Sequence, residues 1–305
     1  MAAALAPAGG RPEPINKTMD RSDLERPDCA AVVEELDELV RWLDGRGLQP
    51  SSWFGTLRDP TPPWEATNRG YGYEPLPGAA DDARFPWFLY WEIAWVVVNN
   101  DFRPGDRLLD LGGSSSLFSY YLASRELEVT TVDLSSALVN NAEDVARRTG
   151  WMLHNRVMDM RELELDGSFD HATSICVLEH IPVSGRVRLS SQLRSLLRPG
   201  GSVSLTFDYL NPSRRARIAT PDDVIEQLVA PSGLEPRGNR EFHDNGQRYL
   251  LSPFHHPRAW WRGWKLRRLW SGQFRLWELA RTKLRNDYTF GALFLERRTG
   301  SGNPG

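Results

Sequence analysis

Cysteine and long apolar runs are scarce in this chain of 305 residues. It contains only Cys29 and Cys176, too few for the several disulfides of a small secreted domain, so we expect a reducing, cytoplasmic setting. The longest apolar stretch, residues 85–98, is interrupted by Pro86 and Glu92 and is shorter than the ~20 residues that span a bilayer. The N-terminus has no basic region and no sustained apolar segment, which argues against a signal peptide.

A strong charge imbalance is also missing. The formal net charge is −3, from 37 lysines and arginines against 40 aspartates and glutamates, so no overall positive field favours nucleic-acid binding. The 25 glycines and 21 prolines are too few for a collagen-like or wholly disordered chain. With 40% hydrophobic and 25% charged residues, the composition is that of a globular protein of one large domain or two small ones.

The first hundred residues divide into a tail and a helical extension. Residues 1–25 are rich in alanine, proline and glycine and are expected to be a disordered tail. Residues 26–100 are expected to form a helical N-terminal extension that also acts as a lid. Its predicted parts are a helix with Asp28 as N-cap and Gly45 as stop, a long loop over 51–78, and a buried helix over 86–99.

Residues 101–305 are expected to form an α/β domain. Short apolar runs alternate there with helical stretches, and this alternation is typical of a doubly wound, parallel sheet covered by helices on both faces. The predicted strands are 107–111, 129–132, 154–158, 169–177, 202–207 and 288–296, and the predicted helices are 117–124, 137–148, 183–197 and 221–229.

The first predicted strand ends in Asp110 and a Gly-Gly-Ser turn. In an open parallel sheet, ligands bind outside the carboxyl ends of the strands, and Gly112 and Gly113 let a ligand approach the backbone closely. A tight turn between strand and helix explains the two glycines equally well. The turn lacks the G-x-G-x-x-G pattern of nicotinamide-dependent oxidoreductases, which we therefore rank well below other ligand-binding proteins.

The second predicted strand ends in Asp133. A carboxylate at this place accepts hydrogen bonds from both ribose hydroxyls of a nucleoside, and its distance of 133 − 112 = 21 residues from Gly112 fits such a site. The same spacing fits NAD, and an aspartate here also serves as a helix N-cap. Further signals are Asp159-Met160 after the third strand and Cys176-Val-Leu-Glu-His-Ile-Pro182, which closes the fourth. Leu197-Arg-Pro-Gly-Gly201 is predicted to be a turn that leads into the fifth strand.

In this order and spacing, LLDLGGSSS, VTTVDLS, the Asp159 loop, FDHATSICVLEHIP and LRPGGSVSLTF resemble the class I S-adenosylmethionine-dependent methyltransferases. The resemblance covers about residues 107–207, with 288–296 matching the terminal strand. It implies a Rossmann-like sheet of seven strands, parallel except for the last, and S-adenosylmethionine as cofactor. The chain departs from the first family motif at Ser114, where a second glycine is usual.

The resemblance also implies roles for single residues. Those beside the methionine part of the cofactor are Asp110, Gly112, Gly113 and Ser114, with Cys176 near the amino group. Asp133 would hold the ribose hydroxyls, with Leu134 beside it, and Asp159 would meet the adenine amine, with the Met160 backbone beside the ring.

Candidate catalytic bases follow the later strands. His180 is the first candidate because it follows the fourth strand at the edge of the crevice, although the Glu-His pair could simply fix the next helix. His243 and Asp244 are second candidates, and Asp208 and Tyr209 could also face the substrate. His255 and His256 are adjacent but have no acidic partner at helical ligand spacing, so no metal is expected.

Residues 258–285 form a basic, tryptophan-rich insertion. It carries nine lysines and arginines against Glu278, and five tryptophans. An amphipathic cap helix, a surface for a peripheral membrane or lipid-linked substrate, and a nucleic-acid surface all fit this composition, the last least well because the charge is confined to one stretch.

The sequence therefore predicts a cytoplasmic methyltransferase that acts on an oxygen or nitrogen of a small molecule, such as a secondary metabolite or sugar. A non-methylating member of the same fold, which uses the cofactor for a cyclisation or rearrangement, is the main alternative. A scaffold that has lost cofactor binding fits poorly, because Asp110, Asp133 and Asp159 are all present.

Overall fold

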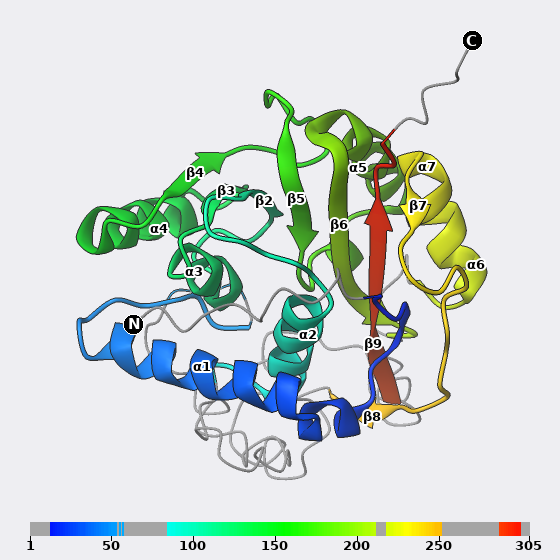
Figure 1. The fold of residues 1–305 in the computed structure, drawn as a ribbon, viewed down its shortest axis with the longest axis horizontal. Coiled ribbons are helices and arrows are strands. Elements are labelled where there is room, and N and C mark those ends of the chain that lie inside the picture. Colours follow the sequence, from blue (N-terminus) through cyan, green and yellow to red (C-terminus); the bar gives the residue numbers. More distant parts are fainter. Residues whose placement is uncertain are drawn as a thin grey trace, which may run out of the picture.

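The computed structural model describes residues 13–53, 55, 57, 84–211, 218–251 and 287–299. Within these residues a mixed sheet runs in the order β1-β9-β6-β5-β2-β3-β4, with β7 and β8 also paired to β9 (Figure 1). The α/β fold class and the doubly wound, mostly parallel sheet are confirmed. The resemblance implies seven strands, whereas the sheet has nine in the described part of the chain. Six of them correspond to the strands located in the sequence, and the other three are two-residue strands that each pair with β9: β1 (Lys17–Thr18), β7 (Glu235–Pro236) and β8 (Tyr249–Leu250).

The longer strands lie close to their predicted positions. Neighbours from β4 to β6 are parallel, and β9 runs antiparallel to β6, as predicted for the last strand. Two ends are wrong. β5 stops at Ser174 rather than continuing to residue 177, because Cys176 has a left-handed φ of 54°. β6 begins at Leu197 rather than at residue 202, so the segment 197–201, which was predicted as a turn, belongs to the strand. The strands are β2 (Arg107–Leu111), β3 (Glu128–Asp133), β4 (Leu153–Val157), β5 (Phe169–Ser174), β6 (Leu197–Tyr209) and β9 (Asp287–Glu296).

The helices cover both faces of this sheet (Figure 1). One predicted helix, 221–229, is instead three short pieces. Pro231 has no N–H for the carbonyl of Gln227, and the Ser190 hydroxyl donates to that carbonyl instead at 3.3 Å. The helical elements are η1 (Arg21–Glu25), α1 (Pro27–Asp44), α2 (Trp87–Val98), α3 (Leu117–Ala123), α4 (Ser136–Thr149), η3 (Leu178–His180), α5 (Val183–Leu196), α6 (Pro221–Val224), η4 (Ile225–Val229) and α7 (Ala230–Ser232).

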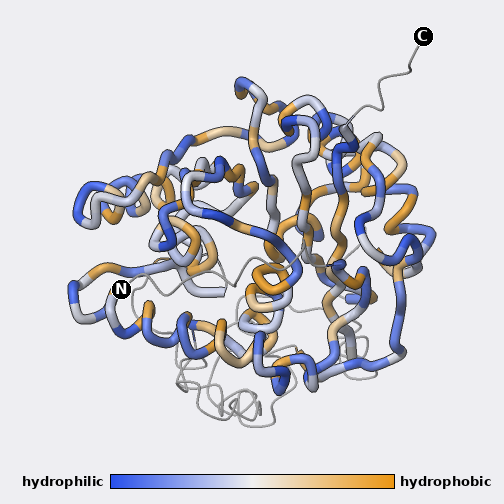
Figure 2. Tube along the Cα trace, viewed as in Figure 1, coloured by the Kyte–Doolittle hydropathy of each residue, from blue (hydrophilic) through white to orange (hydrophobic). Residues whose placement is uncertain are grey.

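Strand alternation divides the apolar residues into two cores. Leu108 of β2 packs with α1 to α4, whereas Leu109 and Leu111 pack with α5 and η4 on the opposite face. Apolar residues are dense along α2, which lies between α1 and the sheet (Figure 2). The prediction of a buried helix at 86–99 is therefore confirmed.

Two predictions for the N-terminal region are wrong. Asp28 is not the N-cap of α1, because Pro27 occupies the first turn and Arg26 is the capping residue, while the Asp28 carboxylate accepts from the Cys29 N–H at 2.9 Å. Disorder does not extend to residue 25, since β1 and η1 lie before it.

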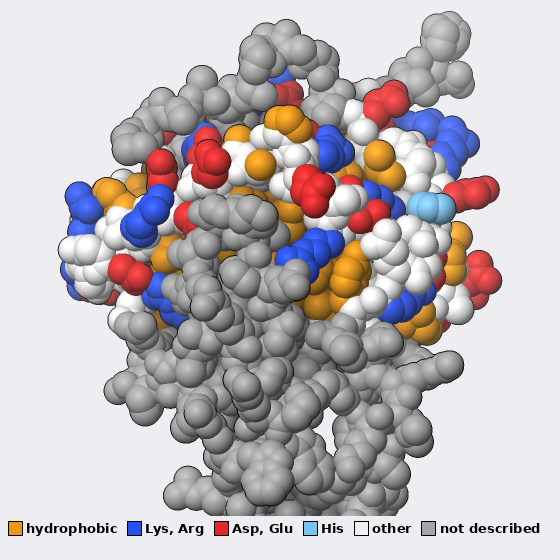
Figure 3. Space-filling view, turned by 90° about the horizontal axis from the view of Figure 1, so that it is seen from below, with side chains coloured by type: hydrophobic (Ala, Val, Ile, Leu, Met, Phe, Trp, Pro, Cys, Tyr) orange, Lys and Arg blue, Asp and Glu red, His pale blue; other side chains and the backbone are white. Residues whose placement is uncertain are grey.

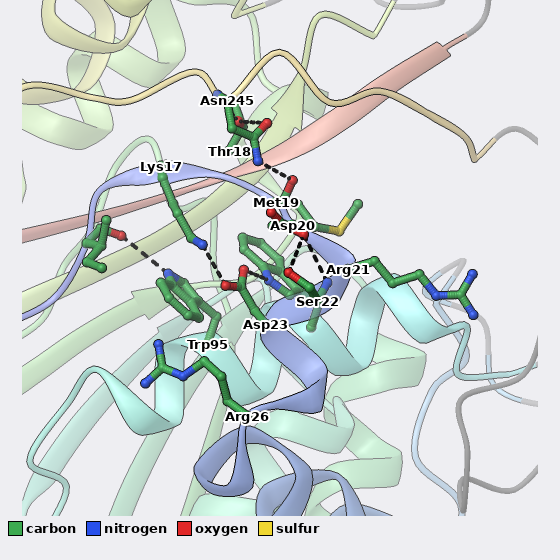
Figure 4. A network of polar contacts seen from close by, with 12 residues as sticks. Lys17, Thr18, Met19, Asp20, Arg21, Ser22, Asp23, Arg26, Trp95 and Asn245 are labelled. Carbon is green, nitrogen blue, oxygen red and sulfur yellow. Dashed lines mark hydrogen bonds and ion pairs between the residues drawn. The ribbon is translucent and has the colours of Figure 1, made fainter.

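A polar network fixes this N-terminal segment against α2 (Figure 4). Lys17 Nζ lies 2.6 Å from Asp23 Oδ1, and Trp91 Nε1 donates to Asp23 Oδ2 at 2.8 Å. Lys17 Nζ also lies 4.3 Å from the centre of the Trp95 ring. The segment therefore holds α2 in place over the sheet.

Several predicted features lie outside the described residues. These are residues 1–12, most of the 51–78 loop, His255 and His256, and the whole 258–285 insertion.

On the described part of the face in Figure 3, positive and negative side chains are interspersed with hydrophobic ones. No helix in the described ranges is both long and apolar enough to cross a membrane.

Candidate functional site

Polar side chains gather where the five parallel strands end. In the sheet, Asp110 of β2 pairs with Thr131 of β3 and Thr173 of β5, and Asp133 of β3 pairs with Val157 of β4. Since the carboxyl ends of parallel strands share one edge, the residues after each strand meet there. The structure thus brings the predicted cofactor-binding segments to one edge.

Two glycines make the turn after β2. Gly112 has φ +79°, and a Cβ there would lie 2.7 Å from Val177 Cγ1 and 3.1 Å from Met160 Cε. A Cβ on Gly113 would lie 1.8 Å from Asp110 Oδ2. Close packing around the turn therefore requires glycine at both positions.

Asp110 lies beneath this turn. Its buried carboxylate accepts from the Ser119 hydroxyl at 2.6 Å and the Thr173 hydroxyl at 2.9 Å. Burial raises its pKa to about 6. Ser114 is also buried, with its hydroxyl 2.6 Å from that of Thr131. Both side chains therefore shape the turn from within, and Ser114 attaches it to β3.

Asp133 ends β3, and Leu134 follows it at the same edge. Asp133 is half-buried, burial raises its pKa, and its Oδ1 accepts from the Ser135 N–H at 2.8 Å. The N-cap of α4 is Ser135, so Asp133 does not serve as the cap, and that alternative is excluded. Leu134 keeps 68% of its surface exposed. An acceptor and an exposed apolar side chain thus stand side by side, as a ribose and an adjoining base would require.

Asp159 and Met160 follow β4. Arg161 Nε donates to Asp159 Oδ1 at 2.9 Å, and this guanidinium lowers the pKa of Asp159 to about 2. The Met160 side chain is buried against Gly112. Asp159 is thus ionised at neutral pH, and an adenine amine would share it with Arg161.

The loop after β5 is attached to β6. The Cys176 N–H donates to the Thr206 hydroxyl at 3.0 Å, and the Cys176 thiol donates to Glu179 Oε1 at 3.1 Å. Burial, reinforced by the Glu179 charge, raises the pKa of the thiol well above its usual range. Ligand atoms of Cys176, Glu179 and Asp208 lie within 4.8 Å of one another. Glu179 was not singled out as a site residue by sequence reasoning.

The candidate bases separate in space. His180 is at the edge, in η3, with its side chain 57% exposed and Nε2 3.7 Å from Glu179 Oε1. His243 pairs by backbone with Asn16 and Thr18, beyond β1 and on the order of 20 Å from β2 at about 4.8 Å per strand. The structure therefore brings His180, and not His243, to the strand ends.

The remaining candidates point in different directions. The Tyr209 ring packs against Phe242 at 5.4 Å in the core opposite to α2, so it faces away from Asp208. Asp244 forms an ion pair with Arg248, in which Asp244 Oδ2 lies 2.6 Å from Arg248 Nη2. Neither Tyr209 nor Asp244 joins His180 at the strand ends.

Known proteins resemble this chain in sequence and fold. Residues 108–201 match a family model described as a methyltransferase domain. The ubiquinone biosynthesis O-methyltransferases of Xanthomonas campestris pv. campestris (strain B100) and Xanthomonas axonopodis pv. citri (strain 306) are each 30% identical, over 143 and 142 residues, which is 46% of this chain and 56% of each relative. The chain thus spans little more than half the length of these relatives. The solved structure of the [4+2]-cyclase SpnF covers 95% of this chain and 99% of its own, with 17% identity and a TM-score of 0.53, and shares the fold.

Proposed function

We propose that this chain, which carries a class I S-adenosylmethionine-dependent methyltransferase domain, transfers a methyl group from S-adenosylmethionine to a small-molecule acceptor. The observation that carries the proposal is the convergence of the Gly112-Gly113 turn, Asp133 and Asp159 at one sheet edge. The family match over residues 108–201 supports it.

The residues present fit this cofactor. Gly112 and Gly113 have no Cβ, so the turn between β2 and α3 would let the methionine part, which carries a carboxylate and an amino group, approach its backbone closely. Asp133 would accept from the ribose hydroxyls, and Leu134 would contact the adenine ring with its exposed apolar surface. Asp159 would accept from the adenine amine, beside the Met160 backbone, and Cys176 would lie near the amino group.

When bound, the cofactor supplies an electrophilic methyl group on a sulfonium. The protein's own contribution is to align the acceptor, exclude water and accept a proton where the acceptor oxygen or nitrogen carries one. His180 is the proposed proton acceptor, because it follows β5 at this edge, and its exposed imidazole lies near the Glu179 carboxylate, which stabilises an imidazolium. His243, on the far side of β1, is the weaker candidate.

The acceptor is proposed to be a small molecule. The Xanthomonas relatives are named for an O-methylation in ubiquinone biosynthesis, which supports this class, although the match covers 56% of their length. Neither Cys29 nor Cys176 forms a disulfide, which supports the proposal that the protein acts in the reducing cytoplasm. The insertion at 258–285 is proposed to bind a lipid-linked acceptor or a membrane surface.

The test is a transfer assay with methyl-labelled S-adenosylmethionine and a panel of phenols, alcohols, sugars and amines. The proposal predicts acceptor-dependent formation of S-adenosylhomocysteine with the label in the product. Tight cofactor binding without transfer to any acceptor class would favour the non-methylating alternative instead.

A further inference from the structure

The face of β6 toward α2 is polar although it is buried. Ser202, Ser204, Thr206 and Asp208 alternate with apolar residues that pack into the opposite core. Each has a hydrogen-bond partner: Ser202 with His171 at 2.8 Å, Ser204 with Asn100 at 2.8 Å, Thr206 with the Cys176 N–H at 3.0 Å, and Asp208 with Asn211 at 2.6 Å. An apolar helix thus covers a polar strand, and these polar groups are satisfied.

Glu92 is the acidic residue that α2 places over this strand. Its side chain is fully buried, and neither carboxylate oxygen accepts a hydrogen bond of normal geometry. Burial raises its pKa well above the usual range, and Glu179 and Asp208 are close enough to raise it further, whereas Thr206 and Cys176 offset this only in part. A buried carboxylate in this setting requires a proton or a cation.

Glu92 therefore adds a third acid to the group at the ends of β5 and β6. Ligand atoms of Glu179 and Asp208 already lie within 4.8 Å of each other and of the Cys176 thiol. Val177, which follows Cys176, lies against Gly112 in the cofactor turn. The three carboxylates, called the acid cluster below, thus adjoin the turn that is proposed to hold the cofactor.

We propose that the acid cluster of Glu92, Glu179 and Asp208 binds the amino group of the acceptor as an ammonium ion, so that the methylated atom is a nitrogen. This inference rests on the proposed methyl transfer. An ammonium carries three or fewer N–H donors directed at separate acceptors, which matches carboxylates from three elements: α2, η3 and β6.

An organic cation fits better than a metal ion. A thiol must lose its proton to bind a metal ion, whereas burial beside acidic side chains raises the pKa of the Cys176 thiol well above its usual range. In the reaction, the ammonium passes one proton by way of Glu179 to His180, whose Nε2 lies 3.7 Å from Glu179 Oε1, and the freed nitrogen lone pair forms the N–C bond. The S–C bond breaks with its electron pair remaining on sulfur, so charge and atoms balance.

The experiment is calorimetry on the full chain saturated with S-adenosylhomocysteine, with benzylamine and benzyl alcohol as a matched pair of probes. We expect benzylamine to bind at least tenfold more tightly than the alcohol. Glu92→Gln and Asp208→Asn should each weaken benzylamine binding at least tenfold and leave the affinity for S-adenosylhomocysteine unchanged. The control is Glu143→Gln, at an exposed position of α4, which should change neither.

Other outcomes overturn the inference. Equal affinity for the two probes is one such outcome, and the absence of any benzylamine binding is another. A third is binding heat with Mg²⁺ or Zn²⁺ that Glu92→Gln abolishes, together with no heat from benzylamine. Glu92→Asp, which keeps the carboxyl group, should retain part of the amine binding, and this separates loss of the charge from loss of the fold. A wild-type protein that binds benzylamine but not S-adenosylhomocysteine would contradict the proposed function and not the ammonium site.

Discussion

The two halves of the strand-end edge are built differently. In the half formed by β2, β3 and β4, each acidic side chain has a short-range partner: Asp110 has Ser119, Asp133 has the Ser135 N–H, and Asp159 has Arg161. In the half formed by β5, β6 and α2, Glu92 comes from a distant part of the chain and has no such partner. The first half is preorganised, whereas the second holds a buried carboxyl group that requires either a proton or a cation.

The largest expected effect is on the preorganised half. Gly113→Val would place a Cβ 1.8 Å from Asp110 Oδ2, and the carboxylate is fixed by two hydroxyls, so the turn must move. We expect the affinity for S-adenosylmethionine to fall more than about 1,000-fold by calorimetry, as a displaced loop loses most of its contacts.

The matched control is Gly150→Ala at the end of α4. Gly150 has φ +75° and nothing within 4 Å of an added Cβ, so this variant tests backbone strain alone. It should cost about 1–2 kcal/mol of stability and leave cofactor affinity unchanged. Equal losses of cofactor affinity in both variants would show that close packing around the Gly112-Gly113 turn does not determine cofactor binding.

The second prediction concerns proton transfer. His180→Ala should lower kcat by about 100- to 10,000-fold for an acceptor that loses a proton, with cofactor affinity preserved, in a steady-state assay. His243→Ala should change kcat little, since its backbone rather than its side chain pairs with Asn16 and Thr18. Normal turnover of His180→Ala would remove it as the base.

The preorganised half is also the part that the sequence predicted best. Asp110 and Asp133 lie at the ends of β2 and β3, whose apolar runs are easily recognised, and Gly112 is in the turn after β2. One partner of each acid is close in sequence: Ser119 lies nine residues after Asp110, and Ser135 two residues after Asp133. Glu92 could not be placed, because an acid within an apolar helix indicates neither which strand it covers nor which residues it meets. The signal that was available is the alternation in β6, SVSLTFDY, whose polar positions lie under α2.

Capping and chain ends were predicted less well, for local reasons. Asp28 resembles an N-cap, but Pro27 begins the helix one residue earlier. The helix at 221–229 was predicted as one unit, yet Pro231 and the Ser190 hydroxyl together change its hydrogen bonding. Such effects depend on single tertiary contacts, and the spacing of apolar residues in the sequence carries no information about them.

The third prediction weakens the cofactor-binding half without moving it. Asp133→Ala removes a charged acceptor for the ribose hydroxyls, and such hydrogen bonds contribute about 1.5–3 kcal/mol, so the affinity for S-adenosylmethionine should fall about 10- to 100-fold. Asp144→Ala, at a surface position of α4 that pairs with Arg148, is the control and should bind normally in the same calorimetric titration. Unchanged affinity in Asp133→Ala would refute the ribose assignment.

The smallest expected effect is on the way the free energy of unfolding depends on pH. Burial raises the pKa of Glu92 well above 4.5 and that of Asp110 from 3.8 to about 6, so the folded protein holds these protons longer than the unfolded chain. The stability that these two groups contribute is fully present at low pH and is lost as the pH rises through their folded-state pKa values. The unfolding free energy should therefore fall from about pH 4 towards neutrality, before other groups are counted.

Glu92→Gln removes one of these two groups. In urea titrations without ligand, the variant should show a flatter pH profile and gain on the order of 1–2 kcal/mol at pH 8, where the wild-type carboxylate is most costly. Asp110 should still titrate in the variant. A wild-type stability that rises between pH 5 and 8, with Glu92→Gln parallel to it, would contradict the buried-charge account.

The most direct measurement of the central claim is a calorimetric comparison of S-adenosylmethionine with NAD⁺ on the full chain. The account predicts saturable, one-to-one binding of S-adenosylmethionine that Asp133→Ala weakens, and no comparable heat with NAD⁺. Absence of heat with S-adenosylmethionine, or equal binding of the two nucleotides, would contradict the account.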